Sequence, residues 1–438
     1  MPTSQKLLAG SPFPSPENRD LADDPTPKDQ AIYLPSVTPG YAIAVYGGQL
    51  RPLPTGVTRA HLNFLDPSNE LFRISHVMSS AGQAYRQKRH CIITARRRSS
   101  TFLICDSGGY QLASGRLKLK GNKDRLSILR WMESNADVAM TLDAPTGPLL
   151  KAGYAFKSFK DCLDETERNL QLFQQHRTPG KIRLLNVLQG NTKQQSDDWY
   201  DAVKRYEFEG WAFAGPTRHD IGLFCRRLLK MADDHLLENK EWIHVLGTAN
   251  LETAVLLTGL QRSINRYYNK KLRISFDTSS PFRMVRYRKL YTLPKLELKR
   301  MTMSSLKLPD DDKLIGSNLR WPWPSPLGDR MTLGDFCVQT SNPKVFRDQQ
   351  SNWYLCHHNL AALCFGVATA NRVFDSQTVS GKYLVGNLVS EAVGAIDEVL
   401  RSGSRSKLGQ HRSTFAELRQ SVDREPHDED RSFDEPTV

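Results

Sequence analysis

The sequence predicts an α/β fold: a (β/α)8 TIM barrel followed by a helical C-terminal subdomain, with disordered ends. Two patterns lead to this prediction. Short apolar runs alternate with longer amphipathic ones, which is typical of parallel strands joined by helices. Successive apolar runs also end in a polar residue or a glycine, as they do at the active-site face of such a barrel. With 39% apolar and 24% charged residues in 438, the composition excludes a collagen-like or wholly disordered chain.

Seven apolar runs are the candidate strands. They cover residues 42–46, 101–105, 137–142, 182–188, 211–214, 242–246 and 273–276. Helical patterns lie between several of them, for example at 198–208 and 221–237. In the second of these helices, one buried face is expected to contain Ile221, Phe224, Leu228 and Met231, which recur at helical spacing.

The residues that end six of these runs form the candidate site. They are Asp106 in CDSGGYQ, Asp143 in LDAPTG, Gln189-Gly190 in VLQG, Gly215 in AFAGP, Gly247 in VLGTA and Asp277 in SFDTSSP. The carboxyl ends of parallel strands meet at one end of a barrel, so we expect these residues to lie together. A doubly wound nucleotide-binding sheet is disfavoured, since the chain contains neither GxGxxG nor GxxxxGK(S/T).

The residue types at these strand ends suit chemistry on a glycosidic bond. A carboxylate such as Asp277 can attack an electrophilic carbon such as an anomeric centre, while a second one such as Asp106 moves a proton. Asp143 and Gln189 can hydrogen-bond the edge of a planar heterocycle, and Tyr110 offers a stacking surface. The alternative for any single aspartate is a cap of the following helix.

The strand-end motifs resemble those of the tRNA-guanine transglycosylase superfamily. The matching residues are DSGGYQ (106–111), LQG (188–190), FAG (213–215), HVLG (244–247) and FDTSSPFR (276–283). The resemblance covers residues 40 to 300, about three fifths of the chain, and DSGGYQ is its most specific part. Members of this superfamily are (β/α)8 barrels that exchange a purine base for a 7-deazaguanine without breaking the nucleic-acid strand.

The resemblance implies a role for each residue of the site. Asp277 would be the nucleophile that attacks C1′ of the target nucleotide, and Asp106 the general acid/base that helps the incoming base displace it. The implied base pocket consists of Ser107, Tyr110, Asp143, Gln189, Gly190, Gly215 and Leu246. In that pocket Tyr110 and Leu246 would sandwich the base, and the others would read its edge. The target nucleotide would have to leave its stack to enter.

Two features depart from the superfamily. Its structural zinc motif, C-x-C-x2-C followed by a distant His, is absent after the barrel, although YLCHHNLAAL (354–363) resembles the helix after that motif. We therefore expect no cofactor and a divergent C-terminal subdomain, with an irregular zinc site of Cys337, Cys356 and His357 as the alternative. The usual double glycine before the base-reading loop is Ala214-Gly215 here, which leaves the accepted 7-deazaguanine open.

The chain is basic, with 60 Lys and Arg against 47 Asp and Glu, a net charge of +13. Residues 261–301 contain 12 Lys and Arg against two acids, and directly after Asp277 they include Arg283, Arg286, Arg288 and Lys289. A second cluster, before the DSGGYQ strand, includes Arg96, Arg97 and Arg98. Such clusters indicate contacts with a nucleic-acid backbone, and a solvated basic face is the alternative.

The chain is expected to divide into four parts. They are a flexible Pro-rich arm (1–40), the barrel (41–300), a C-terminal subdomain that completes or flanks it (301–400), and a charged flexible tail (401–438). The seven cysteines are odd in number and scattered, no signal-peptide pattern precedes them, and no apolar run reaches 18 residues. These features predict a cytoplasmic protein with reduced thiols and no membrane partner.

These expectations favour an enzyme that replaces guanine with a 7-deazaguanine of the preQ0 type in DNA, through a covalent aspartyl-glycosyl intermediate. DNA is preferred to tRNA because the zinc pattern is missing and the arms and basic clusters are additional. A tRNA-modifying transglycosylase is the first alternative, and a catalytically silent nucleic-acid-binding subunit the second. An unrelated barrel glycoside hydrolase would not need the basic flanks. Partner proteins that open a duplex are a further expectation.

Overall fold

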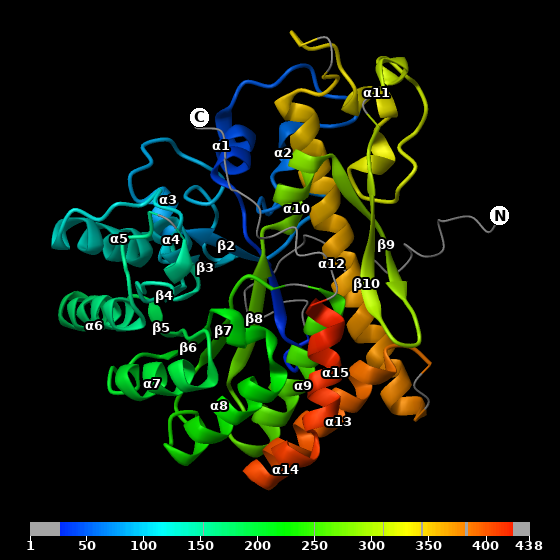
Figure 1. Ribbon diagram of the computed structural model, residues 1–438. Helices are drawn as coiled ribbons and strands as arrows, with labels where there is room; N and C mark the ends of the chain where they lie inside the picture. The colour runs from blue at the N-terminus through cyan, green and yellow to red at the C-terminus, as the bar shows by residue number, and fades with distance from the viewer. Residues whose placement is uncertain are drawn as a thin grey trace.

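Eight parallel strands form the centre of the molecule. The computed structural model describes residues 27–423, except 152, 249, 310, 343–344 and 382–383. The sheet has the order β1-β8-β7-β6-β5-β4-β3-β2, and a parallel bridge between Ser36 and Met78 joins its two edges. The sheet therefore curves into a barrel, which confirms the predicted α/β barrel class (Figure 1).

The strands are short, and helices or turns separate them. The barrel strands are β1 Ile32–Pro35, β2 His76–Ser80, β3 Phe102–Asp106, β4 Val138–Met140, β5 Arg183–Leu188, β6 Gly210–Phe213, β7 Trp242–Val245 and β8 Arg273–Thr278. The helices up to the end of the barrel are α1 Pro39–Gly47, α2 Arg59–Leu62, α3 Ala81–Ala84, α4 Gly109–Ala113, α5 Asn122–Asn135, α6 Phe159–His176, α7 Lys193–Val203, α8 Ile221–Asp233, α9 Leu251–Tyr267 and α10 Ser280–Arg283. The six strands predicted from residue 101 onward are confirmed, with ends that differ by a few residues.

The predicted first strand is wrong. Residues 42–46 belong to α1, which has a proline in its first turn and buries Tyr41, Ala42 and Val45. The first strand of the barrel is instead β1, which lies inside the stretch predicted to be a flexible arm. A short apolar run such as AIAVY fits a buried helix as well as a strand, and the prolines around β1 hid a strand of four residues. The strand β2 was not predicted at all.

Alternate side chains of the strands fill the barrel. The inward set is Ile32, Leu34, Met78, Ile104, Val138, Met140, Leu185, Val187, Ala212, Ala214 and Trp242. The rings of Phe102 and Trp242 stack with centroids 5.0 Å apart near the amino-terminal end of their strands. The outward residues pack with the surrounding helices into a second, larger core, to which α8 contributes its predicted apolar face of Ile221, Phe224, Leu228 and Met231. Because inward and outward residues alternate, polar residues two positions beyond an inward apolar one face the barrel mouth.

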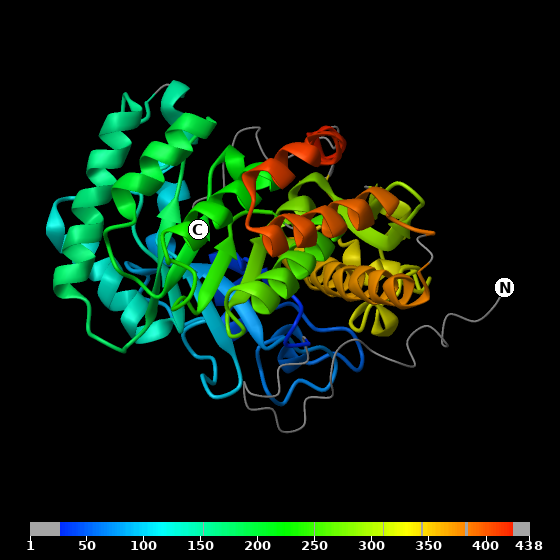
Figure 2. The ribbon, with the colours of Figure 1, turned by 90° about the horizontal axis from the view of Figure 1, so that it is seen from below.

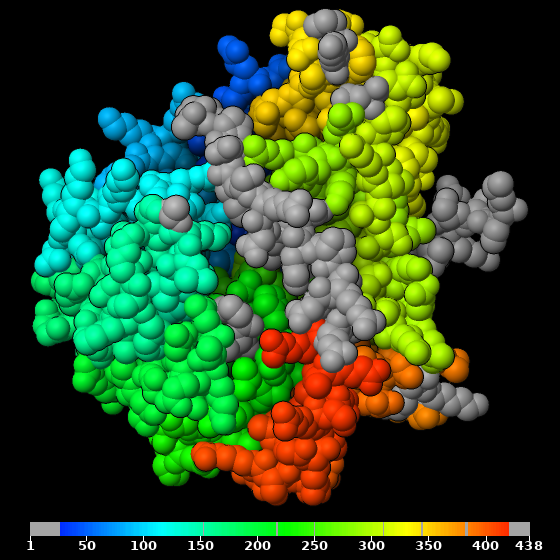
Figure 3. All heavy atoms as spheres, viewed as in Figure 1, coloured from blue at the N-terminus to red at the C-terminus, as the bar shows by residue number. Residues whose placement is uncertain are grey.

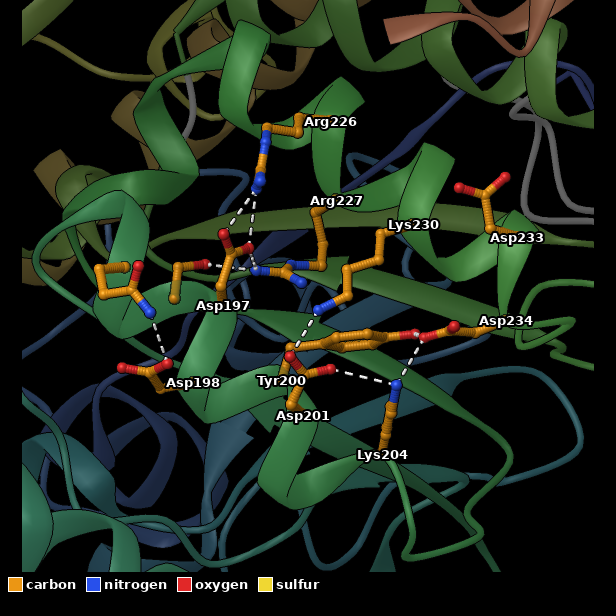
Figure 4. Close-up of polar contacts among 12 residues, drawn as sticks. Asp197, Asp198, Tyr200, Asp201, Lys204, Arg226, Arg227, Lys230, Asp233 and Asp234 are labelled. Carbon is orange, nitrogen blue, oxygen red and sulfur yellow. Dashed lines mark hydrogen bonds and ion pairs between the residues drawn. The ribbon is translucent and has the colours of Figure 1, made fainter.

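The helices α7 and α8 are joined by an ionic network (Figure 4). Asp197 accepts hydrogen bonds from Arg226 at 2.8 Å and Arg227 at 2.6 Å. The Tyr200 ring lies below the Arg227 guanidinium, 4.5 Å away, and its hydroxyl donates to Asp234. The helix predicted at residues 198–208 is α7, which begins earlier, at Lys193. Thr192 caps this helix, because its side chain accepts a hydrogen bond from the Gln195 amide.

A helical region with one β-hairpin follows the barrel. Its elements are β9 Lys289–Leu296, β10 Met301–Lys307, α11 Leu333–Phe336, α12 Gln349–Ser380, α13 Asn387–Ser402, α14 Arg405–Gln410 and α15 Arg412–Asp423. The helix α12 runs beside the hairpin, on the side of the barrel away from α5 and α6 (Figures 1 and 2). His358 Nε2 and Asn359 Oδ1 hydrogen-bond the backbone oxygen and nitrogen of Tyr291, each at 2.8 Å, so this pair attaches the hairpin to α12.

The predicted flexible tail is partly folded. Helices α14 and α15 lie within it, and Phe415 and Leu418 of α15 are 5% and 3% exposed. Their spacing of three residues marks a helix face, but few apolar residues accompany them, so the charged composition concealed it. The rest of the predicted tail, 424–438, and residues 1–26 of the predicted arm lie outside the described residues. None of the helices described here is both long enough and apolar enough to cross a bilayer.

The position of Leu34 allows a test of β1 as a barrel strand. Its side chain is fully buried inside the barrel, so Leu34→Ala should lower the free energy of unfolding by about 2–5 kcal/mol in urea titrations. Leu319 is 65% exposed, and Leu319→Ala should change it by less than about 0.5 kcal/mol. Equal small effects of the two substitutions would contradict the assignment of β1 to the barrel.

Candidate active site

The barrel brings the predicted strand-end residues to one mouth. Asp106 is the last residue of β3 and Asp277 the second-last of β8. Asp143, Gln189 and Gly215 lie in the loops that follow β4, β5 and β6. All these strands are parallel, so their carboxyl ends point the same way. The prediction that these residues lie together therefore agrees with the topology.

Asp277 presents one fixed and one open carboxylate oxygen. The residue is 5% exposed. Its Oδ1 accepts hydrogen bonds from the Gly247 amide at 2.7 Å and from His244 Nε2 at 3.2 Å. Within the described part of the chain, Oδ2 accepts none. Two donors on Oδ1 orient the carboxylate and leave Oδ2 as the oxygen able to react.

A hydrogen-bonded chain inside the barrel holds His244 in place. The Trp242 indole N–H, which can only donate, binds Ser275 Oγ at 2.7 Å, and Ser275 Oγ lies 2.8 Å from His244 Nδ1. Ser275 is fully buried, and His244 Nδ1 is the acceptor that this geometry offers to its hydroxyl proton. The ring proton of His244 then lies on Nε2 and points at Asp277. These residues face inward from the adjacent strands β7 and β8, where His244 pairs with Ser275.

Asp106 is held by the end of the neighbouring strand. Ser80, which pairs with Asp106 across β2 and β3, donates its hydroxyl to Oδ2 at 3.1 Å, and the Gly108 amide donates to the same oxygen at 3.2 Å. The pKa of Asp106 is raised to about 6, because burial disfavours the charged form and because Asp277 carries charge nearby. A carboxyl with this pKa can both give and take a proton near neutral pH.

Asp143 and Gln189 form a buried polar pair. Gln189 Nε2 donates to Asp143 Oδ2 at 2.7 Å, and each residue is 4% exposed. Burial, with a further contribution from the charge of Asp106, raises the pKa of Asp143 to about 7. Gln189 Oε1 is buried and has no hydrogen-bond partner among the residues that the structure describes. Such an acceptor is costly to leave unpaired, and a ligand N–H would satisfy it.

Gly215 and Gly109 leave space beside this pair, whereas Gly108 is required by a close contact with another backbone segment. Gly215 has a φ of +71°, and a Cβ at this position would lie 3.0 Å from Gln189 Oε1. Gly108 has a φ of +108°, and its Cβ would lie 2.7 Å from the Cα of Gly82. The first glycine of DSGGYQ is therefore required by a backbone crossing, whereas Gly109 borders the ligand side, where a Cβ would approach Asp143 Oδ1 to 3.0 Å.

The remaining predicted pocket residues differ in what they offer. Tyr110 is 42% exposed on α4, as a stacking ring requires, and Leu246 is partly buried against the apolar filling of the barrel. Gly190 follows Gln189 with a φ of +128°. The Ser107 side chain was expected in the base pocket, but its buried hydroxyl donates to the Thr141 carbonyl oxygen at 3.0 Å. This hydrogen bond fixes the loop after β3 and uses the hydroxyl proton, so Ser107 could only accept a hydrogen bond from a ligand.

The two basic clusters lie at opposite ends of the barrel. Arg283, Arg286, Arg288 and Lys289 follow β8 and so belong to the mouth side, where Arg286 and Tyr287 are exposed. Arg96 and Arg98 pair instead with Asp137, which precedes β4 at the amino-terminal end of the strands. The Arg96 side chain is 1% exposed, and Arg97 bonds to Ser99. The expected backbone contacts of Arg96, Arg97 and Arg98 beside the site are therefore not supported.

The irregular zinc alternative also lacks its geometry. No group of three or more His, Cys, Asp or Glu residues that could hold a metal occurs among the residues described. The fully buried His357 ring packs edge-on against Phe72, and burial lowers its pKa to about 3. Cys356 Sγ points to the Phe282 carbonyl oxygen at 3.9 Å. Cys337, Cys356 and His357 are thus not brought together as a ligand set.

Three site residues were missed at the level of sequence: His244, Ser275 and Ser80. In HVLG, His244 lies two residues before Leu246 and hence on the same face of the strand. A histidine on the inward face of an apolar strand was the available signal. Ser80 could not be found because β2 itself was not predicted.

Comparison with known proteins adds no assignment. No family model matches the chain, and no curated protein matches it.

The raised pKa of Asp143 predicts a dependence of stability on pH. Between about pH 4 and pH 7 the native carboxyl keeps a proton that the unfolded chain has lost, so wild-type stability should fall as the pH rises through this window. Asp143→Asn removes this titration and should be more stable than wild type above pH 7, by up to about 4 kcal/mol. The difference should vanish near pH 4.

Chemical denaturation across this pH range provides the measurement. The exposed Asp312 supplies the control, because Asp312→Asn should follow the wild-type curve. A constant offset between Asp143→Asn and wild type at every pH would show that Asp143 does not titrate in this window.

Proposed function

We propose that the protein is a transglycosylase that exchanges guanine for a 7-deazaguanine in nucleic acid through a covalent intermediate on Asp277. One observation carries the proposal most directly. A carboxylate with one oxygen fixed by Gly247 and His244 lies within electrostatic range of a second carboxyl, Asp106, whose pKa is near neutral. A nucleophile with a proton shuttle beside it is what a double-displacement at an anomeric carbon needs.

The first displacement breaks the bond between the sugar and guanine. Asp277 Oδ2 attacks C1′, the bond from C1′ to N9 breaks, and its electron pair leaves with guanine. Asp106 in its protonated form supplies the proton that the departing base takes up. A glycosyl ester on Asp277 remains, and the phosphodiester backbone stays intact.

The second displacement reverses these changes with the new base. The N9–H of the 7-deazaguanine gives its proton to the Asp106 carboxylate while N9 attacks C1′. The ester bond breaks and Asp277 leaves as a carboxylate, which the Gly247 and His244 donors stabilise. Both residues return to their starting protonation states, so the cycle needs no cofactor to balance it.

The buried pair of Asp143 and Gln189 suits the guanine edge. Guanine offers N1–H and amino donors, which match the Asp143 carboxylate and the unpartnered Gln189 Oε1. A 7-deazaguanine has the same edge and differs only on the five-membered ring, so one pocket can hold both bases. A base lacking these donors would leave buried acceptors unpaired and should be rejected.

The state of the target nucleotide follows from the access that the pocket requires. A base inside a duplex cannot reach a carboxylate in the barrel mouth, so the nucleotide must be extruded or already single-stranded. The Tyr110 ring is exposed, which supports a role in stacking on an extruded base. We favour DNA as the polymer, with tRNA as the alternative. A silent nucleic-acid-binding subunit is less well supported, because binding alone does not explain the Asp277 and Asp106 arrangement.

Base exchange tests this proposal. Purified protein is incubated with duplex DNA, single-stranded DNA or tRNA carrying labelled guanine, together with 7-cyano- or 7-aminomethyl-7-deazaguanine, and release of label is followed. We expect release from DNA, and Asp277→Asn should abolish it while leaving binding intact. Exchange only in tRNA would replace the preferred polymer. Binding without exchange in any polymer would favour the silent subunit.

The role of His244 predicts a contrast between two substitutions. His244→Gln keeps an N–H donor for Asp277 Oδ1, whereas His244→Leu removes it. We expect His244→Leu to lower kcat by about 10- to 100-fold, the effect of losing one hydrogen bond to a charged group, with KM little changed. His244→Gln should recover most of this loss.

Single-turnover kinetics of adduct formation separates this effect from general damage to the fold. Equal rates of adduct formation in the two variants would show that the donor to Oδ1 is not what matters. A matched loss in thermal stability without a difference in rate would assign His244 a structural role alone.

A further inference from the structure

A second basic surface lies on the rim of the barrel mouth. The loops that follow β5 and β6 face helices α14 and α15 across a cavity of about 800 Å³. The space-filling view shows the orange-red surface of these two helices next to the green surface of α7 and α8 (Figure 3). The cavity is bordered by Asn191 and Lys193 on one side and by Arg412 and Phe415 on the other.

The cavity adjoins the base pocket. Asn191 comes two residues after Gln189, and Asp220 comes five residues after Gly215. Between the two, Arg218 donates hydrogen bonds to the Gly215 carbonyl oxygen at 2.9 Å and to the Gly247 carbonyl oxygen at 3.5 Å. The wall of the cavity is thus continuous with the loops that surround the buried pair and Asp277.

The charges of the cavity are mostly positive and only partly neutralised. Its lining contains one acid, Asp220, and five cations: Lys193, Arg226, Arg405, Arg412 and Arg419. Three of these are ion-paired, Arg226 with Asp197 (Figure 4), Arg405 with Asp233 and Arg419 with Asp220. Lys193 and Arg412 are exposed and have no ion-pair partner among the residues the structure describes.

Two helix ends add to this charge. The α7 and α8 helices, of 11 and 13 residues, both begin at the cavity with Lys193 and Ile221. Their amino termini direct partial positive charge toward it. The paired arginines fix the walls, so the unpaired Lys193 and Arg412 remain the cations available to an anionic ligand.

We propose that this cavity binds the phosphodiester backbone of the strand beside the nucleotide that enters the base pocket. The inference rests on the proposed function and adds the path of its polymer. A strand with one extruded nucleotide must continue across the rim on both sides of the pocket. The exposed Arg286 and Tyr287, after β8, lie on one side of the β7 loop, and the cavity lies on the other. In this proposal helices α14 and α15 contribute one wall of the binding surface on that side of the pocket.

The salt dependence of binding tests this path. Lys193→Gln, Arg412→Gln and the double variant are titrated against fluorescein-labelled single-stranded DNA and, separately, an unmodified tRNA transcript, over a series of KCl concentrations. Each lost phosphate contact should lower the slope of log K against log[KCl] by about 0.7–0.9. The double variant should bind about 10-fold more weakly at low salt, and thermal unfolding should be unchanged because both side chains are exposed.

Lys271→Gln is the matched control. Lys271 is exposed, and Lys271→Gln removes the same charge as Lys193→Gln. Because Lys271 precedes β8 and lies at the opposite end of the barrel, the salt dependence of binding by this variant should equal that of wild type. An unchanged slope in the double variant, the same loss in Lys271→Gln, or no binding by wild type would each overturn the inference. The polymer whose slope changes identifies the strand that uses the cavity.

Base exchange by the same proteins separates this inference from the proposed function. If the wild-type protein binds through Lys193 and Arg412 but exchanges no base, the binding role of the cavity holds and the proposed transglycosylase activity is wrong. If wild type exchanges bases and the double variant binds as tightly as wild type, the proposed activity holds and the cavity is not the binding site.

Discussion

The hydrogen-bonded chain from Trp242 through Ser275 and His244 to Asp277 is the interaction on which the proposed chemistry depends. It begins at the apolar end of the barrel, where Trp242 stacks on Phe102, and ends at the carboxylate in the mouth. Trp242 can only donate to Ser275 Oγ, so Ser275 donates its own proton to His244 Nδ1. The ring proton of His244 therefore lies on Nε2. The packing of the barrel interior thereby sets the orientation of Asp277, the proposed nucleophile, and leaves its Oδ2 open.

Burial gives the other two carboxyls their proposed roles. Asp106 and Asp143 both have raised pKa values, about 6 and about 7, yet their hydrogen-bond partners differ. Asp106 is bound by a hydroxyl and a backbone amide at a strand end, where a proton can be exchanged with a substrate. Asp143 is bound by Gln189, whose second polar atom is unsatisfied, and this arrangement suits recognition of a base edge. The helices around the barrel supply a large apolar core, and its burial offsets the cost of burying these groups.

The sequence could predict the centre of the fold and of the site because both follow from local patterns. Strands from β3 onward are apolar and alternate with helices, and parallel strands bring Asp106, Gln189 and Asp277 to one end. The strand β1 could not be predicted, because its evidence is pairing with β8, far away in the chain. The prediction that Arg96 lies beside the site fails for a different reason. Residues that precede a strand and residues that follow it lie at opposite ends of the barrel, so a position close to DSGGYQ in the sequence need not be close to the site. The hydrogen-bonded chain through His244 and the cavity beside α15 depend on contacts between segments far apart in the sequence, so no local pattern predicts them.

The covalent intermediate gives the most direct test of the account. Protein is incubated with guanine-containing single-stranded DNA and with tRNA in the absence of an incoming base, denatured, digested with nuclease and protease, and analysed by mass spectrometry. We predict a nucleotide-derived adduct on the peptide that contains Asp277, and none on the corresponding peptide of Asp277→Asn. An adduct on another residue, or exchange of labelled guanine without any adduct, would contradict the proposal that Asp277 is the nucleophile.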